Sequence, residues 1–181
     1  MDKGAEAYAR FLSGDDSGLC EVIEEYRNSL MFFLMRYVCS ESTAEELCED
    51  TFYTLVMKRP AFSESAAFRT WLFTIARNKA LNYLRSSAFR KSVPLEEAEG
   101  LFCPDSAERR LLEQERYRAL YGAIDRLPQK QRDLVFLVYF ENMKAAEAAR
   151  VIHKTPRQAV NILFRARKKL RDILEKEGFE E

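Results

Sequence analysis

A long stretch without a single acidic residue constrains this chain more than any other feature of its sequence. Residues 69–91 carry six Lys or Arg side chains and no Asp or Glu, although the 181-residue chain has 29 basic and 29 acidic residues. Between Trp71 and Leu84 the apolar residues recur at steps of three and four, which predicts an amphipathic helix. Because Lys and Arg neutralise phosphates and Asn pairs with base edges, its polar face suits a nucleic-acid strand. A solvated basic helix explains this stretch, taken alone, about equally well.

A second acid-free basic stretch covers residues 155–171 and begins with the clearest local signal in the chain. Thr155, Pro156 and Gln158 supply an N-cap hydroxyl, a proline at the first helical position and an amide that can bond back to the cap. A short alanine-rich helix and a tight turn precede this predicted helix, which is the order of a helix-turn-helix. The alternative is an ordinary helical hairpin with a solvated basic face.

An acidic helix is predicted before the first basic stretch. Ser42 and Glu45 form a capping-box pattern, and Pro60 should stop the helix. One face of this helix mixes acids with large apolar side chains, which a purely solvated surface does not explain. We therefore expect a partner with basic residues to bind the face that carries Glu46, Glu49, Asp50, Tyr53 and Met57.

The remaining pattern indicates an all-α chain with two small helical domains. Helices are expected over residues 5–12, from an Asp16 cap to about Val38, over 107–127 and over 129–140. The periodicity fails from Ser86 to about Ser106, where two prolines and a glycine occur. We therefore expect a first domain over 1–90, a linker over 91–106, and a second domain with the helix-turn-helix over 107–181.

Composition argues against several other kinds of site. The four cysteines, Cys20, Cys39, Cys48 and Cys103, have no CxxC spacing, and His153 is the only histidine, so we expect reduced thiols, no metal and no cofactor. The longest apolar run, Leu134 to Phe140, is far shorter than the roughly 20 residues that span a bilayer. No signal-peptide pattern begins the chain. These features favour a cytoplasmic protein that is not an enzyme.

Two stretches resemble bacterial sigma factors of the extracytoplasmic-function (ECF) type, which keep only regions 2 and 4. The resemblance to region 2 covers AEELCEDTFYTLVMKR and FRTWLFTIARNKALNYLR, at residues 44–59 and 68–85. The resemblance to region 4 covers residues 127–170, from LPQKQRDL to RKKL. The sequence departs from the family pattern at His153, which stands where a glycine is common. We therefore expect this residue to adopt a positive backbone φ. Ala145 and Ala148 are also smaller than the residues usual there.

The resemblance implies a factor that gives core RNA polymerase its promoter specificity and helps to melt DNA. It implies that the β′ clamp coiled coil binds Glu46, Glu49, Asp50 and Tyr53, and that the β flap binds near Leu134 and Phe136. For the minus-10 element it implies Phe62, Ser63, Arg69, Arg77, Asn78, Asn82 and Arg85, with Trp71 more suited to the core. For the minus-35 element it implies Thr155, Arg157, Gln158, Asn161, Arg165 and Lys168.

The resemblance also implies an anti-sigma factor as a partner, a kind of protein that is frequently membrane-anchored. Two alternatives compete with the sigma-factor interpretation. A helix-turn-helix regulator that acts without polymerase would share the second basic helix, but it leaves the acidic face of residues 46–53 without a use. A carboxylate-bridged metal protein in a helical bundle would need Glu-x-x-His pairs, and the chain has one histidine.

Overall fold

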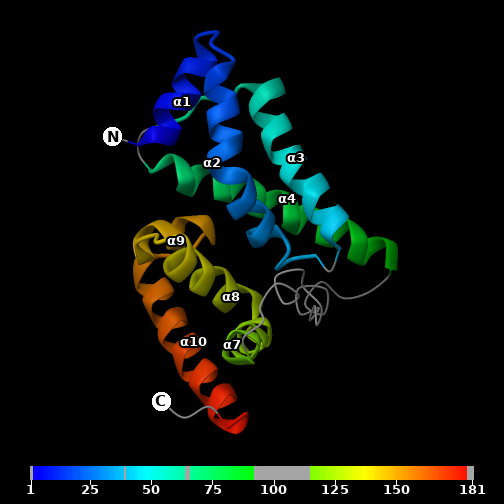
Figure 1. Ribbon diagram of the computed structural model, residues 1–181, viewed down its shortest axis with the longest axis vertical. Coiled ribbons are helices and arrows are strands. Elements are labelled where there is room, and N and C mark those ends of the chain that lie inside the picture. The colour runs from blue at the N-terminus through cyan, green and yellow to red at the C-terminus, as the bar shows by residue number, and fades with distance from the viewer. Residues whose placement is uncertain (1, 39, 64–65, 92–114, 179–181) are drawn as a thin grey trace.

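The computed structural model describes residues 2–38, 40–63, 66–91 and 115–178, and its regular elements are helices (Figure 1). The N-terminal domain contains α1 to α4, and the C-terminal domain contains α7 to α10; no strand occurs in the described residues. The predicted all-α class with two helical domains is confirmed. The elements are α1 (Lys3–Leu12), α2 (Ser17–Leu34), α3 (Glu41–Lys58), α4 (Phe68–Lys91), α7 (Glu115–Asp125), α8 (Gln129–Val135), the π-helix η1 (Phe136–Phe140), α9 (Ala145–Val151) and α10 (Pro156–Lys176).

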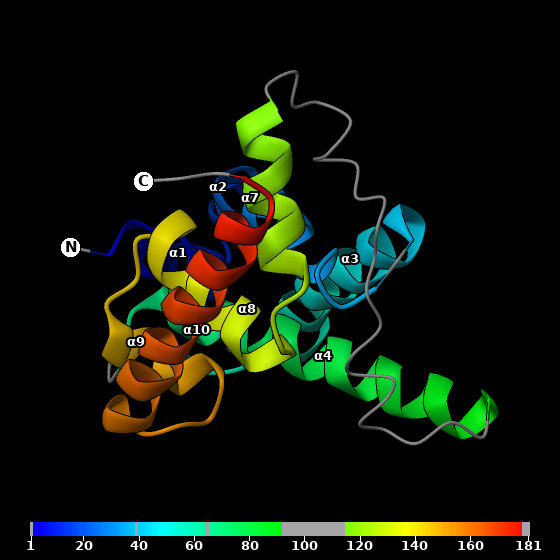
Figure 2. The same cartoon turned by 90° about the horizontal axis from the view of Figure 1, so that it is seen from below.

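Helix α4 is the central element of the fold. In Figure 1 it lies between α1–α3 above and the C-terminal helices below, and in Figure 2 its C-terminal end projects from the body of the molecule. Phe68, Leu72, Phe73, Ala76 and Ala80 on this helix are all fully buried. Neighbours pack against α4 from both domains, with α1, α2 and α3 on one side and α9 on the other. The first basic stretch is therefore the helix on which both domains meet.

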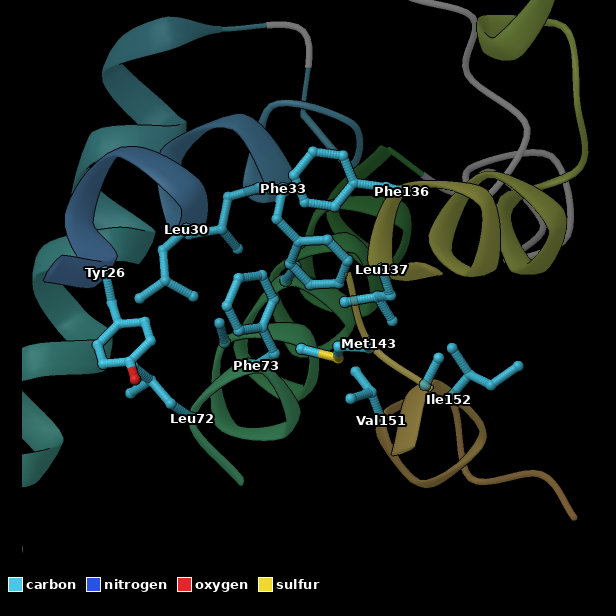
Figure 3. Packing of buried hydrophobic residues seen from close by; sticks show 14 of the residues in the cluster. Tyr26, Leu30, Phe33, Leu72, Phe73, Phe136, Leu137, Met143, Val151 and Ile152 are labelled. Carbon is cyan, nitrogen blue, oxygen red and sulfur yellow. The ribbon is translucent and has the colours of Figure 1, made fainter. Parts of the chain in front are cut away.

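One hydrophobic core runs through both domains. The Phe33 ring of α2 lies 5.2 Å from the Phe73 ring of α4 and 5.8 Å from the Phe136 ring of η1, measured between centroids. Figure 3 shows Leu137 and Met143 of the C-terminal domain continuing this packing beside Phe73. Because contiguous buried contacts of this kind normally mark one core, the two domains are packed against each other rather than merely linked.

Three local signals are confirmed, two of them at helix ends and one in the turn before α10. The Thr155 hydroxyl accepts a hydrogen bond from the Gln158 backbone N–H (3.2 Å), and the Gln158 side-chain oxygen accepts one from the Thr155 N–H (3.0 Å), which is the predicted capping box. Helix α3 ends at Lys58, just before Pro60, with Arg59 in the left-handed region (φ 41°). His153 has a φ of 55°, the positive value expected in the helix-turn-helix turn.

The predicted start of α3 is wrong by two residues. Ser40, and not Ser42, is the N-cap: its side chain accepts a hydrogen bond from the Thr43 backbone N–H, and the helix begins at Glu41. Three residues of this segment carry hydroxyl groups, and the local pattern does not rank them. The extended backbone of Ser40 (φ −136°) lets its hydroxyl turn back to the first turn, as an N-cap requires.

The predicted cap of α2 also needs correction. Asp16 has a helical backbone conformation and its side chain makes no capping hydrogen bond. The neighbouring Asp15 does this instead, because its carboxylate accepts from both the backbone N–H (3.0 Å) and the hydroxyl of Ser17. The helix ends at Leu34, somewhat before the expected Val38.

The predicted helix over 129–140 is not one continuous α-helix. It is α-helical to Val135 and then becomes the π-helix η1, in which the Glu141 N–H donates to the Phe136 carbonyl at 3.1 Å. The wider turn leaves Phe136 and Leu137 buried and Tyr139 exposed. The π-helix thus sets which aromatic rings of the LVFLVYF run enter the core.

Several expectations concern residues beyond the described part of the chain. Helix α4 continues to Lys91, past Ser86, where the sequence pattern fails. The rest of the expected linker over 91–106 lies outside the described residues, and so do residues 107–114 of the next expected helix. Among the helices that the structure describes, none has both the length and the apolar character to cross a membrane.

The two described cysteines differ sharply in environment. Cys20 is exposed, whereas Cys48 is buried and unpaired. Burial raises the pKa of the Cys48 thiol to about 11. At pH 8 this shift lowers the thiolate fraction of Cys48 about 100-fold relative to a thiol of pKa 9, and the thiolate is the reactive species.

We therefore expect iodoacetamide to modify Cys20 at least 100-fold faster than Cys48 in the native protein. Peptide mass spectrometry over a time course would measure both rates, with the urea-unfolded protein as the control in which the difference disappears. Equal rates in the native protein would contradict the burial of Cys48.

Candidate nucleic-acid interface

The exposed end of the α4 polar face carries Asn82 and Arg85. Both side chains are exposed, and the Arg85 guanidinium donates a hydrogen bond to the Asn82 side-chain oxygen at 3.3 Å. Neither residue has a described partner in the C-terminal domain. An amide beside a cation, one turn apart on a helix, can contact a base and a phosphate of the same strand.

An aromatic cluster fixes the loop before α4. The Phe62 ring lies 5.4 Å from the rings of Phe68 and Trp71, and Tyr8 of α1 joins the same group. The Tyr8 hydroxyl donates to the Pro60 carbonyl at 2.9 Å, which ties the loop to α1. Trp71 is partly buried in this cluster, as expected of a core residue. Phe62 is therefore held at the edge of a cavity of about 500 Å³ between α1 and the loop.

The other part of the α4 polar face is covered by the C-terminal domain. Arg69 donates to the Glu141 backbone carbonyl at 2.8 Å, and its guanidinium lies 3.8 Å from the Glu141 carboxylate. The Asn78 side-chain oxygen lies 3.2 Å from Nε2 of His153, in the helix-turn-helix turn. Two side chains expected at the minus-10 element thus contact the C-terminal domain in this structure.

Arg77, a third expected minus-10 residue, is buried in a charged cluster. Only 5% of Arg77 is exposed, and its Nε donates to the Asp133 carboxylate of α8 at 3.1 Å. The same carboxylate accepts a hydrogen bond from the Tyr37 hydroxyl at 2.6 Å. Burial, and then the charge of Asp133, raise the pKa of Tyr37 well above its ordinary value, so the phenol keeps its proton and acts as the donor. In this arrangement Arg77 cannot reach DNA.

The N-terminal half of α10 presents a basic face to solvent. Ala159, Leu163 and Ala166 are buried against α8 and α9, which turns the opposite side of the helix outward. Gln158 is exposed, but its side-chain oxygen is committed to the capping box with Thr155. The side chains free to enter a major groove, here called the α10 face, are Arg157, Asn161, Arg165 and Lys168.

Two apolar residues beside the α10 face were missed from the sequence. Phe164 is 70% exposed and Val160 is 55% exposed, one turn apart on the helix. The sequence did contain a signal for them. Each directly follows a buried residue, Ala159 or Leu163, so each lies outside the buried stripe of the helix. An apolar side chain in the major groove contacts the thymine methyl group, so these residues can add base preference to the basic side chains.

The expected partner-binding surface on α3 is exposed. Glu46, Glu49, Asp50 and Tyr53, here called the α3 face, line an open depression of about 570 Å³ together with the rim residue Val56. Tyr53 is 59% exposed and the nearby Met57 is 62% exposed. The structure therefore gathers acids and large apolar groups on one surface, as the sequence predicts. In the described residues, no three His, Cys, Asp or Glu side chains are grouped to hold a metal ion.

The apolar surface of the C-terminal domain differs from the one expected. Leu134 and Phe136, expected to contact the polymerase β flap, are both buried. An apolar groove of about 600 Å³ lies instead between α7, η1 and α10. It is lined by Leu120, Ile124, Val135, Tyr139, Phe140, Leu170 and Leu174, with Arg167, Arg171 and Glu175 also along it.

Comparison with known proteins places both domains in one family. The family model for Sigma-70 region 2 matches residues 22–90, and the model for Sigma-70 region 4 matches residues 117–170. The ECF RNA polymerase sigma factor RpoE of Cereibacter sphaeroides is 34% identical over 141 residues, which are 75% of this chain and 74% of that protein. The chain belongs to the ECF type of RNA polymerase sigma factors.

This sigma factor has further relatives of the same kind. It is 28% identical over 171 residues to the ECF sigma factor BldN of Streptomyces coelicolor, which is 93% of this chain but only 65% of BldN. It is 25% identical over 154 residues to the ECF sigma factor SigM of Bacillus subtilis, covering 84% and 93% of the two chains. These relatives do not favour a regulator that acts without polymerase.

Solved structures share the fold of this sigma factor. RpoE of Bartonella quintana, solved in complex with the anti-sigma factor NepR, matches with a TM-score of 0.68 at 21% identity over 86% of this chain and 95% of its own. CnrH, solved with the cytosolic domain of CnrY, matches with a TM-score of 0.66 at 21% identity over 97% of both chains.

Proposed function

We propose that this sigma factor binds core RNA polymerase, directs it to promoters with minus-10 and minus-35 elements, and helps to melt the duplex without making or breaking a covalent bond. The observation that carries the proposal is the separation of charge. The acidic and apolar α3 face and the basic α10 face are both exposed, on different domains of a chain with no net charge. Such a chain can bind a basic protein surface and DNA at the same time.

The proposal assigns the two domains different forms of DNA. The α10 face suits duplex DNA, because the first turns of a second helix-turn-helix helix enter the major groove. The loop at Phe62 and the α4 polar face suit a melted strand. Aromatic groups stack on unpaired bases, and amide groups pair with them. Stacking returns about 1–3 kcal/mol per base, which offsets the few kcal/mol of flipping it out.

The proposed partners on the protein side are the β′ clamp coiled coil for the α3 face and the β flap for the apolar groove by α10. Tyr53 and Met57 are the apolar anchors of the first contact, and the acids around Tyr53 supply charge complementarity. An anti-sigma factor is a further proposed partner, because RpoE of Bartonella quintana was solved in complex with the anti-sigma factor NepR, and CnrH was solved with the cytosolic domain of CnrY.

The direct test mixes the purified protein with bacterial core RNA polymerase, measures co-migration by size exclusion, and sequences transcripts started on fragmented genomic DNA. We expect a stable complex and starts that share two upstream elements. Binding to duplex DNA with no affinity for polymerase would overturn the proposal in favour of the regulator.

A prediction for the α10 face follows from the exposure of Arg157. Arg157→Ala should change the ranking of minus-35 variants by about 1–3 kcal/mol if the guanidinium contacts a base. If it contacts a phosphate, the ranking stays the same and the log–log salt slope of binding falls by about 0.9. Competition transcription on a panel of minus-35 variants at several salt concentrations measures both quantities.

The matched control is Lys176→Ala on the same helix. Lys176 is exposed, is the last residue of α10 and does not line the apolar groove, so its loss should change neither the ranking nor the slope appreciably. Arg157 gives a clearer result than Gln158, whose replacement also removes the capping box. If Arg157→Ala behaves like Lys176→Ala in both assays, Arg157 does not contact the minus-35 DNA.

A further inference from the structure

We infer that α1 is a positioning element for minus-10 recognition: Tyr8 and Asp2 hold the two ends of the loop between α3 and α4, which carries Phe62. The inference rests on the proposed function for the role of this loop, whereas the attachment of the loop to α1 is a property of the chain alone. Tyr8 and Asp2 act by placing the loop, so they are positioning residues for the DNA contact.

The Tyr8 side chain holds the start of this loop. Only 1% of Tyr8 is exposed, and its hydroxyl donates to the Pro60 carbonyl at 2.9 Å. Burial raises the pKa of Tyr8 to about 12, so the phenol keeps its proton and remains the donor. Because Pro60 is two residues before Phe62, this bond fixes the chain close to the ring that is expected to contact DNA.

The Asp2 carboxylate holds the other end of the loop and caps two helices at once. One oxygen accepts from the Ala5 backbone N–H at 3.3 Å, which is the N-cap bond of α1. The other oxygen accepts from the backbone N–H of Phe68, the first residue of α4. Figure 1 shows these two helix starts next to each other. A carboxylate satisfies the N–H groups that a helix start leaves unpaired and is favoured there by the helix dipole.

Helix α1 is itself fixed on α2, so it gives the loop a rigid support. A side chain at Gly18 of α2 would clash with the Ala7 carbonyl oxygen of α1. A Cβ at Gly4 of α1 would lie only 2.5 Å from the Tyr26 hydroxyl oxygen of α2. The two helices approach so closely at these points that only glycine fits. A helix packed in this way cannot shift without losing its contacts with α2.

Aromatic packing connects this support to Phe62. The Tyr8 ring lies 5.5 Å from the Phe68 ring and 5.4 Å from the Trp71 ring, and the Phe62 ring lies 5.4 Å from both of those rings. A loop that is already in place loses less conformational entropy when it binds. Release of either end of the loop should therefore weaken the contact with the melted strand.

Asp2→Ser is the variant that releases the α4 end of the loop. Serine is as good an N-cap for α1 as aspartate, but its shorter side chain has one oxygen, which cannot replace the two carboxylate oxygens that serve Ala5 and Phe68. Asp16→Ser is the matched control, because Asp16 precedes α2 and makes no capping bond. Tyr8→Phe releases the other end, since it removes the hydroxyl and keeps the ring.

The fluorescence of Trp71 measures the position of the loop in the chain alone. Trp71 is the only tryptophan, and its ring packs against that of Phe62. We expect the acrylamide quenching constant of Trp71 to rise in Asp2→Ser and in Tyr8→Phe, and to keep its wild-type value in Asp16→Ser. Wild-type quenching in both loop variants would overturn the attachment of the loop to α1.

Recognition is measured with the holoenzyme, formed from core RNA polymerase and the full chain. In competition transcription, the preference for the best minus-10 sequence should fall about tenfold if the released loop is in its binding conformation about a tenth of the time, because apparent affinity scales with that fraction. The affinity for polymerase and the ranking of minus-35 variants should stay those of the wild type.

A purely structural role for α1 predicts a different result. Helix content by circular dichroism, polymerase affinity and both promoter rankings would then fall together. That result, or a wild-type minus-10 ranking in variants whose Trp71 quenching has risen, would overturn the inference. If the wild-type protein does not bind core polymerase, the proposed function fails and the role in minus-10 recognition fails with it, while Trp71 quenching still shows whether α1 holds the loop.

Discussion

Phe33→Ala should lower the free energy of unfolding by about 3–5 kcal/mol, because it removes a large ring from the place where both domains share a core. Phe33 is fully buried, and its ring contacts Tyr37, Phe73 and Phe136 at centroid distances of 5.5, 5.2 and 5.8 Å. Alanine leaves a cavity that these three neighbouring rings cannot readily fill. Urea denaturation followed by circular dichroism measures the loss.

The adjacent Phe32 is a close control for this prediction. Its side chain is 36% exposed, so Phe32→Ala removes the same ring from the same helix with far less burial lost. We expect a change within about 1 kcal/mol for this variant. Similar losses for the two variants would show that Phe33 is not in a packed interdomain core.

Tyr53→Ala should weaken binding to core RNA polymerase by about 2–4 kcal/mol, or roughly 30- to 700-fold. Tyr53 is the largest side chain on the α3 face, it is 59% exposed, and it stands among Glu46, Glu49 and Asp50. A tyrosine in such a position buries a rigid ring when a partner binds, while the surrounding acids exclude water and orient a basic surface.

Phe164→Ala is the matched control, because it removes an even more exposed ring from the other domain. In a titration of labelled protein with core polymerase, without DNA, Phe164→Ala should bind like the wild type. The pattern should reverse for minus-35 preference, which Phe164→Ala should alter and Tyr53→Ala should not. If the two variants bind polymerase equally well, Tyr53 is not an anchor for that contact.

Local chemistry explains which parts of the fold were predictable. The capping box of Thr155 and Gln158 depends on side chains three residues apart, so the sequence alone contains the whole interaction. The start of α3 was misplaced because Ser40 and Ser42 are both good N-caps, and only the backbone conformation distinguishes them. The change to a π-helix at Phe136 has no comparable local signal.

The candidate site likewise has features that local sequence predicts and features that it does not. Exposure of Arg157 and Tyr53 follows from helical periodicity, since residues off the core stripe face outward. The surroundings of Arg77 do not follow from periodicity, because an exposed cation and a cation in a buried ion pair have the same sequence pattern. Its counter-ion, Asp133, is 56 residues away in the chain and comes from the other domain.

The amino-acid sequence by itself determined the helices, the helix-turn-helix, the family, and the separation of acidic and basic faces, because periodicity, capping and charge order are written along the chain. Only the tertiary structure decided which of those faces are free. Part of the α4 polar face lies against the C-terminal domain. The packing of Phe33 against Phe136 brings the two domains together, and this places Arg77 beside Asp133. Long-range packing of this kind depends on which surfaces meet in space, and no local pattern encodes that choice.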